Sequence, residues 1–167
     1  MEPIEFTVKM KIKYLWEFLY VNSYSGFRGV INYGFSAIAI IALCFGYGSS
    51  PLNLAALLIL ASLFTIIDPL MLLFKAWRQM KLSPAFKMPV TYTFSEEGFK
   101  LTQGEESQEA GWELVLLAKE AMGSIYLFTG NNNAVILPKE CFAGEVNELK
   151  MLLKKVRPEE ARKLRVK

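Results

Sequence analysis

Asp68 is the residue whose chemical type is most unusual for its place in this sequence. It is the only charged residue between Gly29 and Phe74, and Pro69 follows it directly. A carboxylate within an apolar segment is a candidate for proton or ion transfer, or for a polar contact with a partner helix. It can also have a structural role, in which it accepts hydrogen bonds from neighbouring residues and locks two helices together. The elements around Asp68 decide between these roles.

Other residues that commonly perform catalysis or bind metals are scarce. The sequence has no histidine, which removes the commonest general base and metal ligand. We expect Cys44 and Cys141 to remain reduced thiols, and Cys141 to be a packing residue rather than a nucleophile. The glycines of residues 123–130 lack the spacing of a phosphate-binding loop, and a net charge of +3 does not predict a nucleic-acid partner. We therefore expect no enzymatic activity, no cofactor, no metal and no bound nucleic acid.

Most apolar residues lie in two consecutive segments, residues 29–48 and 52–74. Each is long enough for a helix to cross a lipid bilayer, which takes roughly 20 residues. Because only a short turn separates them, the sequence predicts a transmembrane helical hairpin with both ends on one side of the membrane. Basic residues precede the first segment and follow the second, so we expect a multi-pass protein of the cell membrane with both termini in the cytoplasm. These basic residues are Lys9, Lys11, Lys13, Arg28, Lys75, Arg78, Lys81 and Lys87.

The hairpin fixes the expected depth of Asp68. With the turn near residues 50 and 51, Asp68 lies level with Asn32 and Tyr33, about four residues from the cytoplasmic end of a span. A carboxylate there is far from the bilayer centre, and Asn32, Tyr33 or Arg28 can donate hydrogen bonds to it. Pro69 has no N–H, so we expect it to free a carbonyl near Thr65 and to kink the helix. This shallow position favours the structural role, with Asp68, Asn32 and Tyr33 as an intramembrane polar cluster.

Residues 1–28 predict a strand followed by a helix. Apolar and polar residues alternate over residues 4–10, which is the period of a half-buried strand. The next segment, residues 13–27, is helical in pattern and rich in aromatic residues. Its rings suit a membrane interface, but several of them share one helical face, so packing on the protein explains them equally well.

Residues 75–167 predict a β-rich domain. Apolar and polar residues alternate in six short segments separated by turns, which is the pattern of an antiparallel meander. The segments are 89–95, 99–102, 108–114, 114–122, 124–129 and 134–139. A helix is predicted over residues 145–156. Its apolar face consists of Val146, Leu149, Leu153 and Val156.

The strand predicted at residues 4–10 needs a partner sheet, which only the C-terminal region provides. We therefore expect an α+β membrane protein in which the two-helix hairpin is inserted within one antiparallel β domain. Its parts are residues 1–28, whose strand joins the C-terminal sheet, the hairpin at 29–74, and a cytoplasmic domain with a C-terminal capping helix at 75–167.

Three stretches carry a resemblance to a known family: "YTFSEEGFKL" at 92–101, "GWELV" at 111–115 and "YLFTGNNNAVILPKECF" at 126–142. With the layout of the whole chain, they resemble the YcxB-like proteins, small bacterial membrane proteins with two spans. The resemblance implies a C-terminal domain similar to the pleckstrin-homology (PH) fold. It implies no established biochemical activity.

Lys139 and the basic C-terminal tail are the candidate contacts with lipid or a partner. Pro138, Lys139 and Phe142 are similar to the strand-ending signature of the family, but Glu140 stands where the resemblance implies a basic residue. That departure weakens the expectation, implied by the resemblance, of anion binding at this turn. In the tail, anionic lipid headgroups are candidate ligands, although a solvated helix face explains the charges equally well. The tail residues concerned are Arg162, Lys163 and Arg165.

The sequence leaves two non-catalytic functions open. In the first, the chain is an integral-membrane binding or scaffolding protein whose cytoplasmic PH-like domain binds a peptide, a protein or lipid headgroups. In the second, it is a small accessory subunit of a membrane complex, such as an exporter accessory or an immunity-type protein, and acts through its transmembrane hairpin. The expected partners are the lipid bilayer and an unidentified protein or a second copy of the chain.

Overall fold

The computed structural model describes residues 3–46, 50–130, 133–142, 145–161 and 164, apart from the side chain of Arg28. The chain forms two compact units. The first, called here the β unit, comprises Met1–Phe18 and Met80–Lys167, and the second, the helical unit, comprises Leu19–Gln79. The three-part division at residues 28 and 74 stays a prediction.

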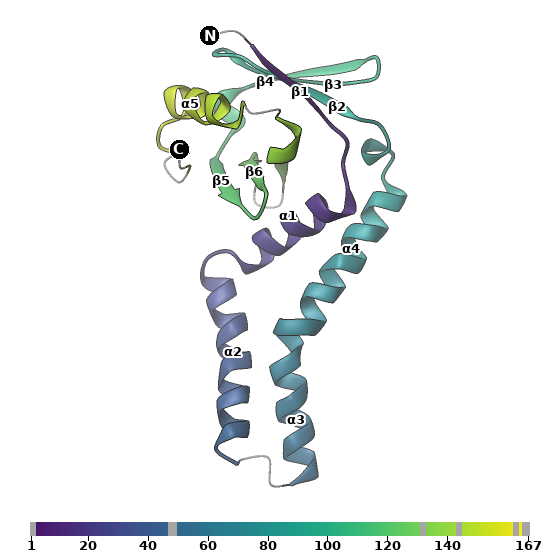
Figure 1. Ribbon diagram of the computed structural model, residues 1–167, viewed down its shortest axis with the longest axis vertical. Helices are drawn as coiled ribbons and strands as arrows, with labels where there is room; N and C mark the ends of the chain where they lie inside the picture. The colour runs from purple at the N-terminus through teal and green to yellow at the C-terminus, as the bar shows by residue number, and fades with distance from the viewer. Residues whose placement is uncertain (1–2, 47–49, 131–132, 143–144, 162–163, 165–167) are drawn as a thin grey trace. The chain divides into compact units, whose positions relative to one another are not determined.

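Four antiparallel strands form the larger sheet of the β unit (Figure 1), in the order β1-β2-β3-β4. They are β1 (Ile4–Val8), β2 (Val90–Phe94), β3 (Gly98–Gln103) and β4 (Glu106–Gly111). Ile4 lies opposite Phe94 and Val8 opposite Val90, so the N-terminal strand is an edge strand beside β2. Every second side chain of β1 is buried, because alternate side chains of a strand point to opposite faces.

Three further antiparallel strands form a second sheet, in the order β5-β6-β7. They are β5 (Leu117–Ala121), β6 (Ser124–Phe128) and β7 (Ala134–Pro138). The central strand β6 is covered on both faces. Ile125 and Leu127 belong to the hydrophobic core. On the other face Phe18, in helix α1 (Ile12–Tyr24), packs on Tyr126 and Phe128 with ring centroids 5.8 and 6.1 Å apart.

The hydrophobic core draws on both sheets and on helix α5 (Val146–Val156). Phe94 of β2, Leu127 of β6 and Leu153 of α5 are all fully buried. The apolar face predicted for the C-terminal helix is the face that packs on this core. The α+β class, the antiparallel sheets and the C-terminal helix expected from the sequence are confirmed.

A short 3₁₀ turn replaces the end of one predicted strand. Alternation predicts a strand over residues 108–114, but β4 ends at Gly111 and a 3₁₀ turn follows at Trp112–Leu114. Trp112 is buried, and its Nε1 donates a hydrogen bond of 3.0 Å to the carbonyl of Ser95. This tertiary hydrogen bond holds the indole in the core and outweighs the local alternation.

The helical unit contains two helices that lie side by side (Figure 1), α2 (Phe27–Cys44) and α3 (Pro51–Ser62). Ser50 caps α3, since its hydroxyl accepts a hydrogen bond of 3.2 Å from the N–H of Asn53. A π-helical segment, η1 (Leu63–Ile67), continues α3 and leads into α4 (Asp68–Leu82). The long helix therefore extends past residue 74, where the sequence predicts the end of the apolar segment.

The surface of the helical unit is strongly apolar. Neither α3 nor η1 buries any of its residues. The most exposed large apolar side chains of α2, α3 and the long helix include Phe27, Val30, Ile38, Leu52, Ile59, Ile66, Leu70 and Met71. A soluble protein rarely exposes so continuous an apolar surface.

One helix of the described chain is long and apolar enough to cross a membrane. It runs over Pro51–Leu82, has 32 residues, and only 6% of its apolar window is buried within the chain. Helix α2 meets the same criteria of length and composition only when it is taken together with α1, across a sharp bend. These criteria suggest membrane association, whereas the two-span hairpin and the orientation of the termini stay predictions.

Candidate functional site

Asp68 begins helix α4 and accepts a hydrogen bond from Tyr24, the last residue of α1. The Tyr24 hydroxyl lies 2.6 Å from Oδ2 of Asp68 and 2.7 Å from the carbonyl oxygen of Phe64. A tyrosine hydroxyl has one hydrogen, so the two acceptors share it. The Tyr24 side chain therefore connects the end of α1 to two successive turns of the long helix.

The π-helical segment explains why the carbonyl of Phe64 is available. In a π-helix each N–H bonds to the carbonyl five residues earlier, and the N–H of Asp68 bonds in this way to Leu63. The next N–H of this pattern would reach Phe64 from residue 69, but Pro69 has no N–H. The tyrosine hydroxyl donates to this carbonyl instead. The sequence predicts that Pro69 frees a carbonyl near Thr65. In the structure the freed carbonyl belongs to Phe64, one residue earlier, because hydrogen bonds of a π-helix span five residues instead of four.

Two further tyrosines lie against Tyr24. The rings of Tyr20 and Tyr24 are stacked with centroids 4.7 Å apart, and the ring of Tyr33 lies 5.1 Å from that of Tyr24. The hydroxyls of Tyr20 and Tyr33 are hydrogen-bonded to each other. We call Tyr20, Tyr24, Tyr33 and Asp68 the tyrosine–aspartate cluster.

The three residues of the predicted polar cluster have different surroundings. Asp68 has a hydrogen-bond donor within the helical unit, but the donor is Tyr24 rather than Asn32 or Tyr33. Tyr33 joins the cluster through the ring of Tyr24 and the hydroxyl of Tyr20. Asn32 makes no hydrogen bond to Asp68 within the described chain. Tyr24 lies outside the two apolar segments, and its long side chain reaches Asp68 from the end of α1.

The absence of a side chain at Gly29 allows the backbone of Tyr24 to come close. A Cβ atom at residue 29 would clash with the carbonyl oxygen of Tyr24. Gly26, with a φ of 73°, turns the chain between the two residues. This arrangement was not predicted from the sequence. The available signal was a pair of glycines two and five residues after Tyr24.

The tyrosine–aspartate cluster consists of one carboxylate and three phenol hydroxyls. Over the residues that the structure describes, no group of three or more His, Cys, Asp or Glu side chains could hold a metal ion. A carboxylate that accepts a hydrogen bond from a stacked tyrosine is held in one orientation. The geometry therefore favours a lock that holds the start of α4.

Lys139, a predicted contact with lipid or a partner, has an ionic partner inside the β unit. It begins the 3₁₀ turn η4 (Lys139–Cys141), and its Nζ lies 2.5 Å from Oε1 of Glu120 on β5. Lys150 of α5, whose side chain is only 6% exposed, lies 2.9 Å from Oε2 of Glu120. Burial opposes ionisation of Glu120, but the hydrogen bonds and charges of both lysines outweigh it and lower the pKa of Glu120 below its usual value. These three residues, called here the Glu120 triad, join β5, η4 and α5.

The remaining predicted contacts lie outside the described residues; they are Arg162, Lys163 and Arg165. The segment before them is attached to the β unit. The carbonyl of Glu160 accepts a hydrogen bond of 3.0 Å from the N–H of Ala118 on β5. Arg157 donates one of 3.0 Å to the carbonyl of Val115. Contact between the basic tail and anionic lipid stays a prediction.

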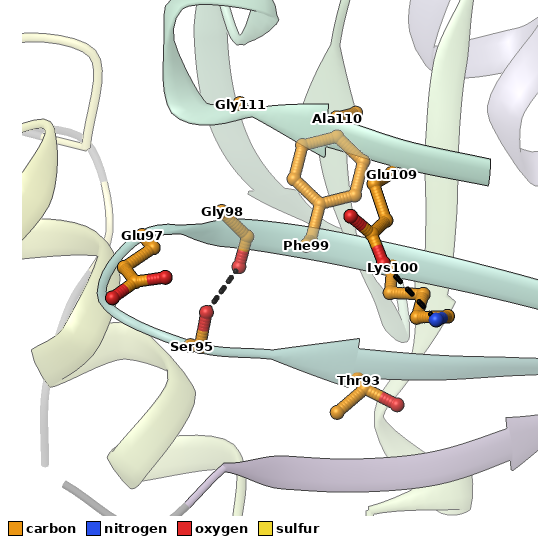
Figure 2. Close-up of a pocket in the computed structure, with 9 residues that line it drawn as sticks. All are labelled: Thr93, Ser95, Glu97, Gly98, Phe99, Lys100, Glu109, Ala110 and Gly111. Atoms are coloured by element: carbon orange, nitrogen blue, oxygen red, sulfur yellow. Dashed lines mark hydrogen bonds and ion pairs between the residues drawn. The ribbon is translucent and has the colours of Figure 1, made fainter.

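Two hollows in the β unit are lined by strands of the larger sheet. The first has a volume of about 500 Å³ and lies along β2, β3 and β4. Figure 2 shows Lys100 and Glu109 on neighbouring strands of its lining, with Nζ 3.0 Å from Oε1. The second has a volume of about 410 Å³ and lies at the opposite end of the same strands. Its lining includes Val8, Met10, Phe86, Met88 and Leu101, with Glu106 and Gln108 of β4.

These features define a class of protein: an α+β chain in which a helical unit with an apolar surface is inserted between the first and second strands of an antiparallel β unit. Residues 94–153 match the family model of the YcxB-like proteins, from the end of β2 into α5. This segment is similar to the YcxB-like proteins, which confirms the resemblance drawn from the sequence. No curated protein and no solved structure matches the chain.

Proposed function

We propose that this chain is an integral membrane protein that holds a non-catalytic binding module at the membrane surface. The helical unit is the membrane anchor in this proposal, and the β unit is the binding or scaffolding module. The chain crosses the bilayer twice and has both termini in the cytoplasm.

The contrast between the surfaces of the two units carries this proposal. In the helical unit Leu52 is 80% exposed, Met71 65% and Ile59 62%. The β unit has its own fully buried core, so its apolar residues are satisfied without lipid. Lipid is the natural cover for the apolar helices, and the basic residues on both sides of the apolar segments support cytoplasmic termini.

The architecture of the β unit supports a PH-like binding module. Two antiparallel sheets of four and three strands, followed by a helix, agree with the domain that the YcxB-like resemblance implies. The Glu120 triad has the geometry of a structural ion network rather than of a catalytic site, because both carboxylate oxygens are occupied by lysines. The partners proposed are a protein segment or a second copy of the chain, with anionic lipid near the basic tail.

The alternative, an accessory subunit that acts through its transmembrane helices, has less support. Asp68 is the residue that such a subunit would use for a polar contact with a partner helix. Its carboxylate already accepts a hydrogen bond from Tyr24.

Extraction and labelling of membranes test the proposed function. We expect the chain to remain in the membrane pellet after alkaline carbonate and after urea, and to be released only by detergent. Two variants in a Cys44→Ser/Cys141→Ser background test the orientation: a membrane-impermeant maleimide should label Ser50→Cys in intact cells, but label Lys87→Cys only after lysis. Release by carbonate would contradict anchoring, and labelling of Lys87→Cys from outside would contradict the orientation.

A further inference from the structure

We propose that β4 is the docking site of the β unit and that it binds an extended protein segment of alternating basic and apolar residues as an additional strand. This inference rests on the proposed function, since it names the surface and the kind of partner that the binding module uses. Three observations carry it: a free sheet edge, two hollows along that edge, and a local excess of acidic residues.

The backbone of β4 is a free edge of the larger sheet. Over the described residues, β4 pairs only with β3. The carbonyl of Gly98 accepts a hydrogen bond from Ser95, on the side of β2, so the cross-strand pair Gly98 and Gly111 is not hydrogen-bonded. Bonded and non-bonded pairs alternate along an antiparallel ladder, so Ser107 and Glu109 direct their N–H and C=O groups away from β3. Such an edge can pair with another strand.

Both hollows border β4, the first towards its Gly111 end and the second towards its Glu106 end. Glu109 lines the first hollow (Figure 2), whereas Glu106 and Gln108 line the second. Successive side chains of an added strand point to opposite faces of the sheet. Those on one face would lie beside Glu109, and those on the other would lie over the second hollow. Its apolar lining, which includes Met88 and Leu101, suits an apolar side chain.

A fixed loop forms one wall of the second hollow. Nε2 of Gln103 donates hydrogen bonds of 2.7 and 3.1 Å to the carbonyls of Ala85 and Met88. These bonds hold the 3₁₀ turn η2 (Pro84–Phe86) and the residues after it against the end of β3. The apolar wall is thus built before a partner arrives, which lowers the entropic cost of binding.

The charge of β4 and its flanks selects a basic partner. Four acidic residues and no basic residue occur between Gly104 and Ala118: Glu105, Glu106, Glu109 and Glu113. Within the β unit, Lys100 on β3 pairs with Glu109 at 3.0 Å. Pairing β4 with β4 of a second copy would place acidic side chains near one another, which is unfavourable. Lysine or arginine residues on an incoming strand would instead meet opposite charges.

Binding of a defined peptide to the full chain in neutral detergent micelles tests the proposal. The probe is a fluorescein-labelled peptide of alternating lysine and valine, and anisotropy measures its binding at low salt. A glutamate–valine peptide is the charge control. A lysine–valine peptide with N-methylated backbone groups on every second residue is the strand control, since it keeps the charge but cannot form one row of hydrogen bonds. We expect binding of the first peptide and neither of the controls.

Variants of β4 locate the binding surface. Ser107→Pro removes an outward N–H and should weaken binding by about tenfold or more, whereas the matched Ser107→Ala variant keeps that N–H and should bind normally. Glu109→Gln should weaken binding by about twofold to threefold, the loss of one exposed ion pair. Circular dichroism and thermal unfolding check that each variant is folded. If Ser107→Pro does not fold, the N-methylated peptide decides whether strand pairing occurs.

Several results would overturn the inference. Equal binding of the N-methylated and unmodified peptides would mean attraction by charge without strand pairing. A lack of binding by the lysine–valine peptide would remove the proposed partner class. Self-association of the full chain that is lost in Ser107→Pro would identify a second copy as the occupant. Because binding is measured in micelles, failure here leaves the anchoring result intact, and carbonate release of the chain would leave the peptide result intact.

Discussion

The hydrogen bond between Tyr24 and Asp68 should control local stability at the start of α4. In Tyr24→Phe the ring stays, but Asp68 and the carbonyl of Phe64 both lose their donor, and Pro69 offers no N–H to replace it. Intramembrane hydrogen bonds are worth roughly 0.6 to 2 kcal/mol. Because one hydroxyl hydrogen serves both acceptors, we expect a loss of about 1–2 kcal/mol rather than twice that amount.

Hydrogen-exchange mass spectrometry of the full chain in micelles measures this loss locally. A destabilisation of about 1–2 kcal/mol corresponds to roughly 5- to 30-fold faster exchange of the amides at residues 65–72. Tyr33→Phe is the matched control, since it removes a hydroxyl that bonds to Tyr20 and not to Asp68. Asp68→Asn should have little effect, because its amide oxygen can still accept, whereas Asp68→Leu should resemble Tyr24→Phe.

Two results would refute this reasoning. If Tyr24→Phe accelerates exchange no more than Tyr33→Phe, the hydrogen bond does not stabilise the start of α4. If Asp68→Asn keeps normal exchange but abolishes partner binding or a cellular phenotype, the charge of Asp68 has a functional role and the structural lock is not its purpose.

Three further predictions concern Gly29, the Glu120 triad and the turn after β5. Gly29→Ala should displace the backbone of Tyr24 and speed exchange at residues 65–72 at least as much as Tyr24→Phe, since its Cβ would meet a carbonyl oxygen. Glu120→Gln should lower the free energy of unfolding by about 3 kcal/mol at pH 7, because it removes the negative charge that faces the nearly buried Lys150. The folded-state pKa of Glu120 is lowered, so the stability that its carboxylate contributes is fully present above the unfolded-state pKa, near 4.5, and is lost as the pH falls through the folded-state pKa. In urea unfolding, the difference in stability between Glu120→Gln and the original chain should therefore stay constant from pH 6 to 8 and shrink at that lower pH. Met122 has a φ of 54°, which asparagine adopts more readily than methionine, and its side chain is exposed. Met122→Asn should therefore increase the free energy of unfolding by about 0.5 kcal/mol and raise the unfolding temperature slightly. An unchanged or lower unfolding temperature would contradict strain at this turn.

Local side-chain periodicity was sufficient to predict most elements of the β unit. Alternation located the strands, because the burial of a strand side chain depends on which of two faces it occupies. The spacing of Leu149 and Leu153 likewise located the buried face of α5, and both side chains are fully buried. The prediction that failed, at Trp112, concerned a residue whose indole bonds to the carbonyl of Ser95 on a neighbouring strand. Periodicity carries no information about that bond.

The sequence by itself determined that an acid and a proline interrupt an apolar segment and that this acid needs a polar partner. Only the tertiary structure decided the identity of the partner. Tyr24 and Asp68 are 44 residues apart, and their contact depends on a turn at Gly26, a close approach at Gly29 and a π-helical segment before Pro69. Lys139 is likewise predicted from the sequence as a contact with lipid or a partner, and only the fold shows its ion pair with Glu120. Such pairings depend on how distant elements meet, and no local pattern of residue types encodes that geometry.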